Sequence, residues 1–328
     1  MAAIIIQTTE KIIALWQNGE RMICQSSVPL PMKGAVCLSI LGSSKVKGAR
    51  KMKQKRNTGV LPTKYPLLLV HGMGFRDNNR LNYWGRIPRK LKEENCAIYY
   101  GGQDGNGTIE KNAEKLKCRI EEILEETGAE KVNIIAHSKG GLDVRYAIST
   151  LGMGDKVASV TTISTPHHGS KTVDLLLKMP DCFVRFAAIC ANVWLRICGD
   201  KNPDTYQVFH SLTTESAAVF NQNNPDNEKV YYQSYAFVMK NSFSDILLFF
   251  PHFVVKLIEG ENDGLLSPRA VQWGVFKGLY KSNSNRGISH CDEVDLRRRR
   301  LTKKLGEGIS DMVDFYINVV RDLQRSGF

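Results

Sequence analysis

The sequence lacks any uninterrupted apolar run of about eighteen residues, the length expected of a membrane-spanning helix. The closest approach, from Cys182 to Cys198, is interrupted by charged side chains. Near the beginning, Ile4 to Ile6 and Ile12 to Trp16 are apolar, but no basic leader precedes them. The sequence therefore predicts neither a membrane span nor a cleaved signal peptide.

Closely spaced cysteine pairs are also missing, as are the histidine companions of a zinc site. Scattered cysteines without such spacing are typical of free thiols in a reducing compartment. Together with the poor match to a signal peptide, they favour a cytoplasmic location, with secretion as the alternative. The eight cysteines are Cys24, Cys37, Cys96, Cys118, Cys182, Cys190, Cys198 and Cys291.

Acidic residues are scarce relative to basic ones, and the net charge of the chain is +12. Seven basic residues and no acidic or aromatic ones lie between Ser44 and Arg56. Without aromatic side chains for stacking, we interpret this stretch as a solvated linker and expect no nucleic-acid partner. Arg297 to Arg300 form a second basic cluster, interpreted as a helix or loop face, with attraction to acidic lipid as the alternative.

Beyond the linker, strand and helix patterns alternate. Short apolar runs indicate buried strands, and apolar spacing from Ile109 to Thr127 predicts an amphipathic helix that stops at Gly128. This alternation predicts an α/β domain over residues 61–328, with a mostly parallel sheet and helices on both faces, after an N-terminal extension over 1–60. Other expected elements are strands at Leu67–Val70, Cys96–Tyr100, Val157–Ile163, Val230–Val238 and Val275–Tyr280, and a closing helix at Ile309–Leu323.

The run from Lys131 to Tyr146 places a serine at a strand-to-helix corner. Apolar residues from Val132 to Ala136 indicate a buried strand, and apolar residues at helical spacing follow the corner. Ala136 and Gly140 stand two residues before and after Ser138, where small side chains let strand and helix approach each other. This pattern is that of a nucleophile elbow, and Ser138 is the candidate nucleophile.

A serine hydroxyl needs a base to take its proton and a carboxylate to orient that base. In the chain order Ser, Asp or Glu, His, the last histidine, His290, is the best candidate base. Asp263, in a glycine-flanked loop, is the predicted carboxylate, with Asp245 and Glu261 as alternatives. Among the other downstream histidines, His167 and His168 are expected to line the cleft, and His252 to be partly buried.

The carbonyl oxygen under attack develops negative charge, which requires backbone donors. The N–H after the nucleophile belongs to Lys139, and the N–H in the loop after the first central strand belongs to Met73. We expect the Lys139 side chain to face solvent. His71, Gly72, His137 and His167 are predicted to contribute to substrate binding.

With these residues assembled, the chain resembles the lipases of the α/β-hydrolase superfamily, particularly the bacterial triacylglycerol lipases. The resemblance implies an α/β-hydrolase fold and cleavage of lipid carboxylic esters through an acyl-enzyme, with Ser138, Asp263 and His290 as catalytic residues. It spans Pro66 to Leu296 through His71-Gly72-Met73-Gly74, Ala136-His137-Ser138-Lys139-Gly140-Gly141, Ser164-Thr165-Pro166-His167-His168-Gly169-Ser170, Asn262-Asp263-Gly264-Leu265 and His290-Cys291-Asp292.

Such lipases carry a helical lid, and the apolar residues between Ser170 and Asn224 predict a lid insertion over 170–224, with a core insertion or an oligomer interface as alternatives.

Some of these lipases also hold a structural calcium through an aspartate two residues after the base, which Asp292 matches. Leu296 stands where that pattern has a further polar side chain, so no metal is predicted, no cofactor is required, and calcium at Asp292 is kept only as an open alternative.

The expected partners are a lipid ester substrate and, transiently, a lipid interface; no oligomeric state is predicted. Two alternatives use the same acyl-enzyme chemistry, a short-chain carboxylesterase and an acyltransferase. Alternatives of another class are a catalytically silent binding protein of the same fold and a nucleic-acid or membrane-surface protein that acts through Ser44 to Arg56.

Overall fold

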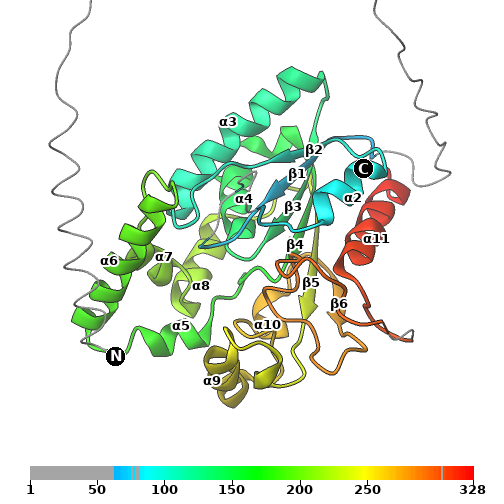
Figure 1. Cartoon of the computed structure of the whole chain (residues 1–328). Helices are drawn as coiled ribbons and strands as arrows, with labels where there is room; N and C mark the ends of the chain where they lie inside the picture. The colour runs from blue at the N-terminus through cyan, green and yellow to red at the C-terminus, as the bar shows by residue number, and fades with distance from the viewer. Residues whose placement is uncertain (1–62, 75–76, 78–81, 304–305) are drawn as a thin grey trace, which may run out of the picture. The chain divides into compact units, whose positions relative to one another are not determined.

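Six parallel strands form one sheet in the described part of the chain, residues 63–74, 77, 82–303 and 306–328 of this computed structural model (Figure 1). The strand order is β2-β1-β3-β4-β5-β6. This confirms the predicted α/β class, whereas the extension over 1–60 and the basic linker lie outside the described residues. The strands are β1 (Leu67–Val70), β2 (Ile98–Tyr100), β3 (Val132–His137), β4 (Val157–Ile163), β5 (Tyr231–Phe237) and β6 (Val275–Tyr280).

The two faces of the sheet have separate apolar cores, because successive strand residues point to opposite sides. Leu67 and Leu69 pack in the core that contains residues of α2 (Ile87–Glu93) and α11 (Met312–Arg325). Leu68 and Val70 pack with residues of α3 (Ile109–Thr127) and α4 (Gly140–Ser149). Helices α3 and α11 lie on opposite sides of the sheet (Figure 1). The two cores hold the strands, and therefore the loops at their carboxyl ends, in fixed positions.

Helix α3 shows how local sequence sets these boundaries. The Thr108 side chain accepts a hydrogen bond from the backbone N–H of Lys111 and so caps the first turn. Gly128 ends the helix in the left-handed region at φ 67°, which a glycine adopts without strain. Both ends agree with the sequence-based prediction.

Two helical segments interrupt the sheet near the candidate site. The first lies between β4 and β5 and consists of α5 (Lys171–Leu176), α6 (Asp181–Ile197), α7 (Thr205–Ser211) and α8 (Thr214–Asn223). The second lies between β5 and β6 and contains η3 (Ser242–Ser244), α9 (Phe249–Glu259) and α10 (Pro268–Val271). Helix α4 (Gly140–Ser149) and η2 (Met153–Lys156) connect β3 to β4.

Arg297 to Arg300 lie in turns and irregular chain, in agreement with the loop option of their prediction. Two other local details differ from the predictions. The last helix begins at Met312 rather than Ile309, because the Asp311 side chain caps it by accepting from the N–H of Val313. Helix α2, which follows a stretch rich in polar residues, was not predicted.

No helix in the described ranges is long and apolar enough to cross a membrane. The longest apolar candidate in the sequence, Cys182 to Cys198, corresponds to α6. The six cysteines within those ranges are all free thiols.

Candidate active site

Ser138 lies at the corner between β3 and α4, with φ at 53°. A non-glycine residue in the left-handed region stores about 1–3 kcal/mol of strain, which the surrounding structure must offset. The Ser138 N–H donates to the carbonyl of Ile163, and its carbonyl accepts from the Thr165 hydroxyl at 2.8 Å. These bonds to β4 and the loop after it fix the backbone and leave the partly exposed serine at the edge of a cavity.

Glycines around the corner permit close contacts that a side chain would block. A Cβ atom on Gly140 would lie 2.4 Å from the carbonyl oxygen of His71, and one on Gly72 would lie 2.8 Å from the Cβ of Ser138. A Cβ atom on Gly141 would lie 2.2 Å from the Thr165 hydroxyl oxygen. The small residues expected at an elbow are therefore required by packing.

His290 and Asp263 form a buried pair beside this corner. The Nδ1 atom of His290 lies 2.9 Å from Oδ2 of Asp263, and the other carboxylate oxygen accepts from the N–H groups of Leu265 and Leu266 at 2.8 Å each. Burial alone would raise the pKa of Asp263, but His290 and these backbone donors lower it overall. The charged carboxylate therefore orients the imidazole, and Nε2 of His290 has no hydrogen-bond partner among the described residues.

The alternative carboxylates are engaged elsewhere. Asp245 pairs with Arg297 and accepts a hydrogen bond from Ser289, whereas Glu261 forms an exposed ion pair with Lys281 at 3.0 Å. Neither replaces Asp263 beside His290. His252 is buried and bonds Ser242 through Nδ1 at 2.8 Å, so it is a hydrogen-bonded structural histidine.

The backbone N–H groups of Met73 and Lys139 have no hydrogen-bond partner within the described part of the chain. Both residues flank the elbow, so these groups are available to an oxyanion.

The expectation that the Lys139 side chain faces solvent was wrong: it is buried, and its Nζ lies 2.6 Å from Oδ1 of Asp143. Burial raises the pKa of Asp143, and the Lys139 charge partly opposes that shift.

His137, the residue before the nucleophile, is held on both sides. Its Nδ1 lies 2.6 Å from the Tyr83 hydroxyl, and its Nε2 lies 3.0 Å from Oε2 of Glu293. Burial lowers the pKa of His137 well below its ordinary value, so the ring is neutral. Glu293 is completely buried and lies 3.7 Å from Nδ1 of His290.

Sequence reasoning missed Glu293. The only available signal was its position three residues after His290, because a turn returns side chains at that spacing to the same side. His137, His290 and Glu293 offer ligand atoms within 4.8 Å of one another. The hydrogen bonds of His137 to Glu293 and of His290 to Asp263 account for this closeness without a metal.

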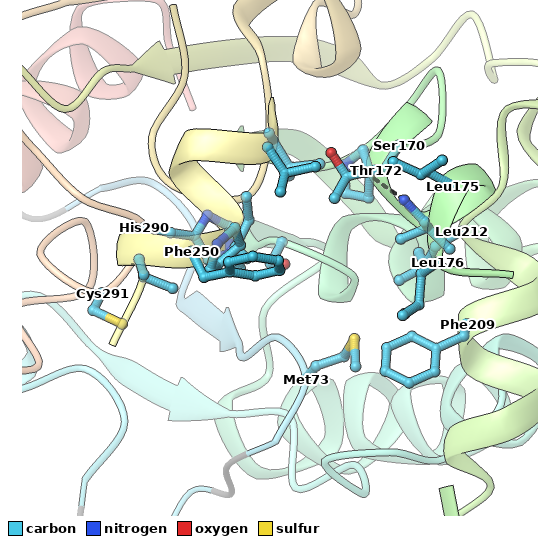
Figure 2. Close-up of a pocket in the computed structure, with 18 of the residues that line it drawn as sticks. Met73, Ser170, Thr172, Leu175, Leu176, Phe209, Leu212, Phe250, His290 and Cys291 are labelled. Carbon is cyan, nitrogen blue, oxygen red and sulfur yellow. Dashed lines mark hydrogen bonds between the residues drawn. The ribbon is translucent and has the colours of Figure 1, made fainter. Parts of the chain in front are cut away.

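Ser138 and His290 both line an apolar cavity of about 860 Å³ (Figure 2). One side is formed by the first insertion, through residues such as Leu175, Leu176 and Phe209, and another by the α9 region, through residues such as Phe250. Figure 2 shows Met73 and Phe209 on one side of the cavity and His290 and Cys291 on another. Burial raises the pKa of the Cys291 thiol to about 12, which makes it a poor nucleophile at neutral pH.

Of the residues predicted to bind substrate, only His137 lines this cavity. Both ring nitrogens of His71 contact backbone carbonyl oxygens: Nδ1 lies 2.8 Å from that of Gly72, and Nε2 lies 3.1 Å from that of Gln103. Gly72 allows the close packing against Ser138 described above. His167 is buried and stacked on Trp273 rather than directed at the cleft, because its ring nitrogens contact Arg145 and Thr162.

Asp292, the candidate calcium ligand, already has protein partners. Nη1 of Arg297 lies 3.2 Å from its Oδ1, and the Ser289 hydroxyl lies 3.0 Å from its Oδ2. Calcium prefers about six to eight oxygen ligands, and a guanidinium beside the same carboxylate repels a cation. Because Arg297 also pairs with the nearby Asp245, the residues around Asp292 do not fit a calcium ion.

Comparisons with known proteins agree with this geometry. The triacylglycerol lipase 2 of Saccharomyces cerevisiae is 28% identical over 263 residues, which cover 76% of this chain and 75% of the yeast protein. The triacylglycerol lipase of Vibrio cholerae is 34% identical over 178 residues, which cover 51% of this chain and 56% of that protein. The chain thus matches only a little over half the length of the bacterial relative.

Solved structures show the same fold. The mature lipase BlEst2 of Bacillus licheniformis matches with a TM-score of 0.56 and 21% identity, over 74% of this chain and 91% of the lipase chain. The metagenomic carboxyl esterase MGS0156 matches with a TM-score of 0.61 and 15% identity, over 82% of this chain and 78% of the esterase chain. The predicted resemblance to α/β-hydrolase lipases is confirmed. Because the palmitoyl protein thioesterase family model matches residues 66–297, the chain belongs to that family of α/β-hydrolases.

Proposed function

We propose that this chain hydrolyses carboxylic esters of lipids through an acyl-enzyme formed on Ser138. The observation that carries the proposal is the common cavity: a strained serine and a histidine paired with a buried carboxylate line the same large apolar space. The lipase relatives support the same reaction class.

In the first half-reaction, Oγ of Ser138 attacks the ester carbonyl carbon while its proton passes to Nε2 of His290. The N–H groups of Met73 and Lys139 donate to the oxyanion, and the Asp263 carboxylate stabilises the imidazolium. When the intermediate collapses, the carbon–oxygen bond to the alcohol breaks and the alcohol takes the proton from His290. Water then repeats the sequence on the acyl-enzyme, which releases the fatty acid and restores Ser138.

The cavity favours long acyl chains over short ones. Its volume of about 860 Å³ lies in the upper part of the range of small-molecule pockets, and its lining is mostly aliphatic and aromatic. Each methylene that enters such a lining contributes about 0.8 kcal/mol. We infer acylglycerols as the substrate class, because they combine long chains with an ester carbonyl.

The first insertion is proposed to act as a lid. Helices α5 and α7 line the cavity, while α6 presents an outward row of apolar side chains. A lid that opens at a lipid surface would place this row against lipid and widen access to Ser138. The exposed side chains of α6, each between 60% and 67% exposed, are Phe183, Phe186, Ile189, Trp194 and Ile197.

A substrate-length profile tests this function. Purified protein is assayed on glycerol esters from short to long acyl chains, with and without an alcohol acceptor, beside Ser138→Ala. We expect kcat/KM to rise with chain length and activity to disappear in the variant. Activity confined to short esters would support an esterase instead, transfer to the alcohol an acyltransferase, and retained activity in Ser138→Ala would overturn the mechanism. A palmitoyl thioester belongs in the series, since it presents the same carbonyl to Ser138.

A further inference from the structure

A second cavity, of about 510 Å³, has a wall dominated by positive charge. It adjoins the loop that carries His290, because Asp292 forms part of its lining. Asp292 is also the one acidic residue among those that line it. The cationic side chains are Arg286, Arg297, Arg299, Arg300 and Lys303.

Two of these cations are balanced by carboxylates. Arg297 pairs with Asp245 and Asp292, and Arg300 lies 3.5 Å from both Asp311 and Asp314. Asp292, the single acidic residue in the wall, therefore pairs with Arg297.

The other three cations have no such partner. In the ranges that the structure describes, no carboxylate lies within ion-pair distance of Arg286, Arg299 or Lys303. Burial lowers the pKa of Arg286, and the positive charges of Arg297 and Arg299 lower it further, against the smaller opposing effect of nearby aspartates. The cavity therefore has uncompensated positive charge that an anion would neutralise.

An exposed apolar segment lies directly beside this cavity. We call residues 242–247 the apolar lip, because Phe243, Ile246 and Leu247 are 84%, 89% and 76% exposed. The Arg286 guanidinium donates to the carbonyl of Ser244, in the middle of the lip. Asp245, also in the lip, pairs with Arg297. These contacts join the lip and the cationic cavity into one surface.

We propose that this surface docks on a membrane, with the phosphate of an anionic lipid headgroup in the cationic cavity and the apolar lip among the acyl chains. Guanidinium groups bind phosphate oxygens through paired, charge-assisted hydrogen bonds. Free phosphate or a nucleic acid would satisfy the cations but would leave the lip in water. In a lipid membrane the headgroup phosphate lies next to the acyl chains, as the cationic cavity lies next to the apolar lip. A lipid therefore satisfies both parts of the surface at once.

This docking extends the lipid contact of the proposed function, but it is measurable without hydrolysis. The lip leads directly into Leu248 and Phe250, which line the cavity of Ser138. A headgroup held in the cationic cavity would therefore place the entrance of the catalytic cavity against the lipid surface.

Vesicle co-sedimentation of the full chain carrying Ser138→Ala tests the proposal. Phosphatidylcholine vesicles are compared with vesicles that also contain phosphatidic acid. Because two cations that attract the anionic surface are lost and two repelling carboxylates are added, Arg299→Glu/Lys303→Glu should weaken binding to the anionic vesicles by about thirtyfold or more. The matched control, Lys111→Glu/Arg321→Glu, reverses two exposed charges on α3 and α11 and should change binding less than about threefold.

Two further variants separate the parts of the surface. Arg299→Gln/Lys303→Gln, which removes charge without reversing it, should give an intermediate loss. Phe243→Ser/Ile246→Ser should weaken binding to both kinds of vesicle. Arg299→Glu/Lys303→Glu and its matched control are also compared in a chain whose seven basic residues between Ser44 and Arg56 are replaced by glutamine. Binding of that basic segment to anionic vesicles then does not conceal the effect.

Equal binding to neutral and anionic vesicles, or equal losses in the charge-reversal pair and its control, would overturn the proposal. So would binding of inorganic phosphate by the chain without any preference for anionic vesicles. If the chain with Ser138 failed to cleave esters, the hydrolysis proposal would fall while the vesicle result would stand. Unchanged hydrolysis of a soluble ester by Arg299→Glu/Lys303→Glu would show that the catalytic cavity is intact.

Discussion

The carboxyl group of Glu293 approaches Nδ1 of His290 to 3.7 Å, on the side where that nitrogen already bonds Asp263 at 2.9 Å. One imidazole thus faces two buried carboxyl groups. Burial raises the pKa of Glu293 well above its ordinary value, and the charge of Asp263 raises it further. The pKa of Asp263 is lowered instead, since His290 and backbone donors outweigh its burial. Asp263 therefore favours the charged form, whereas Glu293 favours the protonated form.

This difference predicts unequal effects of two isosteric substitutions. Asp263→Asn should lower kcat on a soluble ester by about 100-fold or more, because the imidazole loses its charged partner and correct tautomer. Glu293→Gln keeps both the shape and the neutrality of the side chain and should change kcat by less than about fivefold. Steady-state kinetics at neutral pH checks both. Equal losses would mean that Glu293 shares the charge.

Stability should depend on pH with a sign set by Glu293. The folded protein keeps a proton on this carboxyl that the unfolded chain releases above the ordinary pKa of 4.5. The free energy of unfolding therefore falls as the pH rises from about 4.5 toward the folded-state pKa. Glu293→Gln removes this loss, so its free energy of unfolding in urea titrations should increase relative to that of the wild type as the pH rises above about 4.5. Parallel pH profiles of the two proteins would contradict the assignment.

The sequence alone predicts those parts of the site that depend on short-range patterns and chain order. The strand, small residues and helix around Ser138 are contiguous, and packing requires Gly140 and Gly141 to be glycine. The order of Ser138, Asp263 and His290 follows from the order of strands in a parallel sheet, so the Asp–His pair could be predicted without coordinates.

Other features depend on tertiary packing that no local pattern encodes. His71 and His167 stand in the predicted loops, but their rings bond atoms of the protein itself and do not line the cavity. Lys139 follows the nucleophile on a helical turn, yet Asp143 allows it to be buried. Asp292 matched a calcium ligand only by its position after His290, and the pairing of Arg297 with both Asp292 and the distant Asp245 is a tertiary contact that this position does not reveal.

The Arg297 contacts predict indifference to calcium removal. Hydrolysis and the melting temperature should be the same in EDTA and in calcium chloride, because Arg297 supplies the positive charge between Asp245 and Asp292. Arg297→Ala leaves two buried carboxylates unpaired, which should cost about 3–5 kcal/mol of unfolding free energy. Added calcium should restore part of the melting temperature of this variant alone. A wild-type protein that loses activity in EDTA would show that a metal is bound despite Arg297.

Asn106 is expected to position the loop after β1, here called the oxyanion loop, which carries Met73 and Gly74. Its Oδ1 accepts from the N–H of Gly74 at 3.0 Å, and its Nδ2 donates to the hydroxyl of Thr205, the first residue of α7, at 2.7 Å. Asn106→Leu removes both bonds and should lower kcat by about tenfold or more with little change in KM, because Met73, beside Gly74, donates only to the oxyanion. Thr205→Val is the matched control, since it removes the bond to the insertion and leaves the one to Gly74. It should therefore keep most of kcat, and an equal loss in both variants would assign the effect to the insertion rather than to the oxyanion loop.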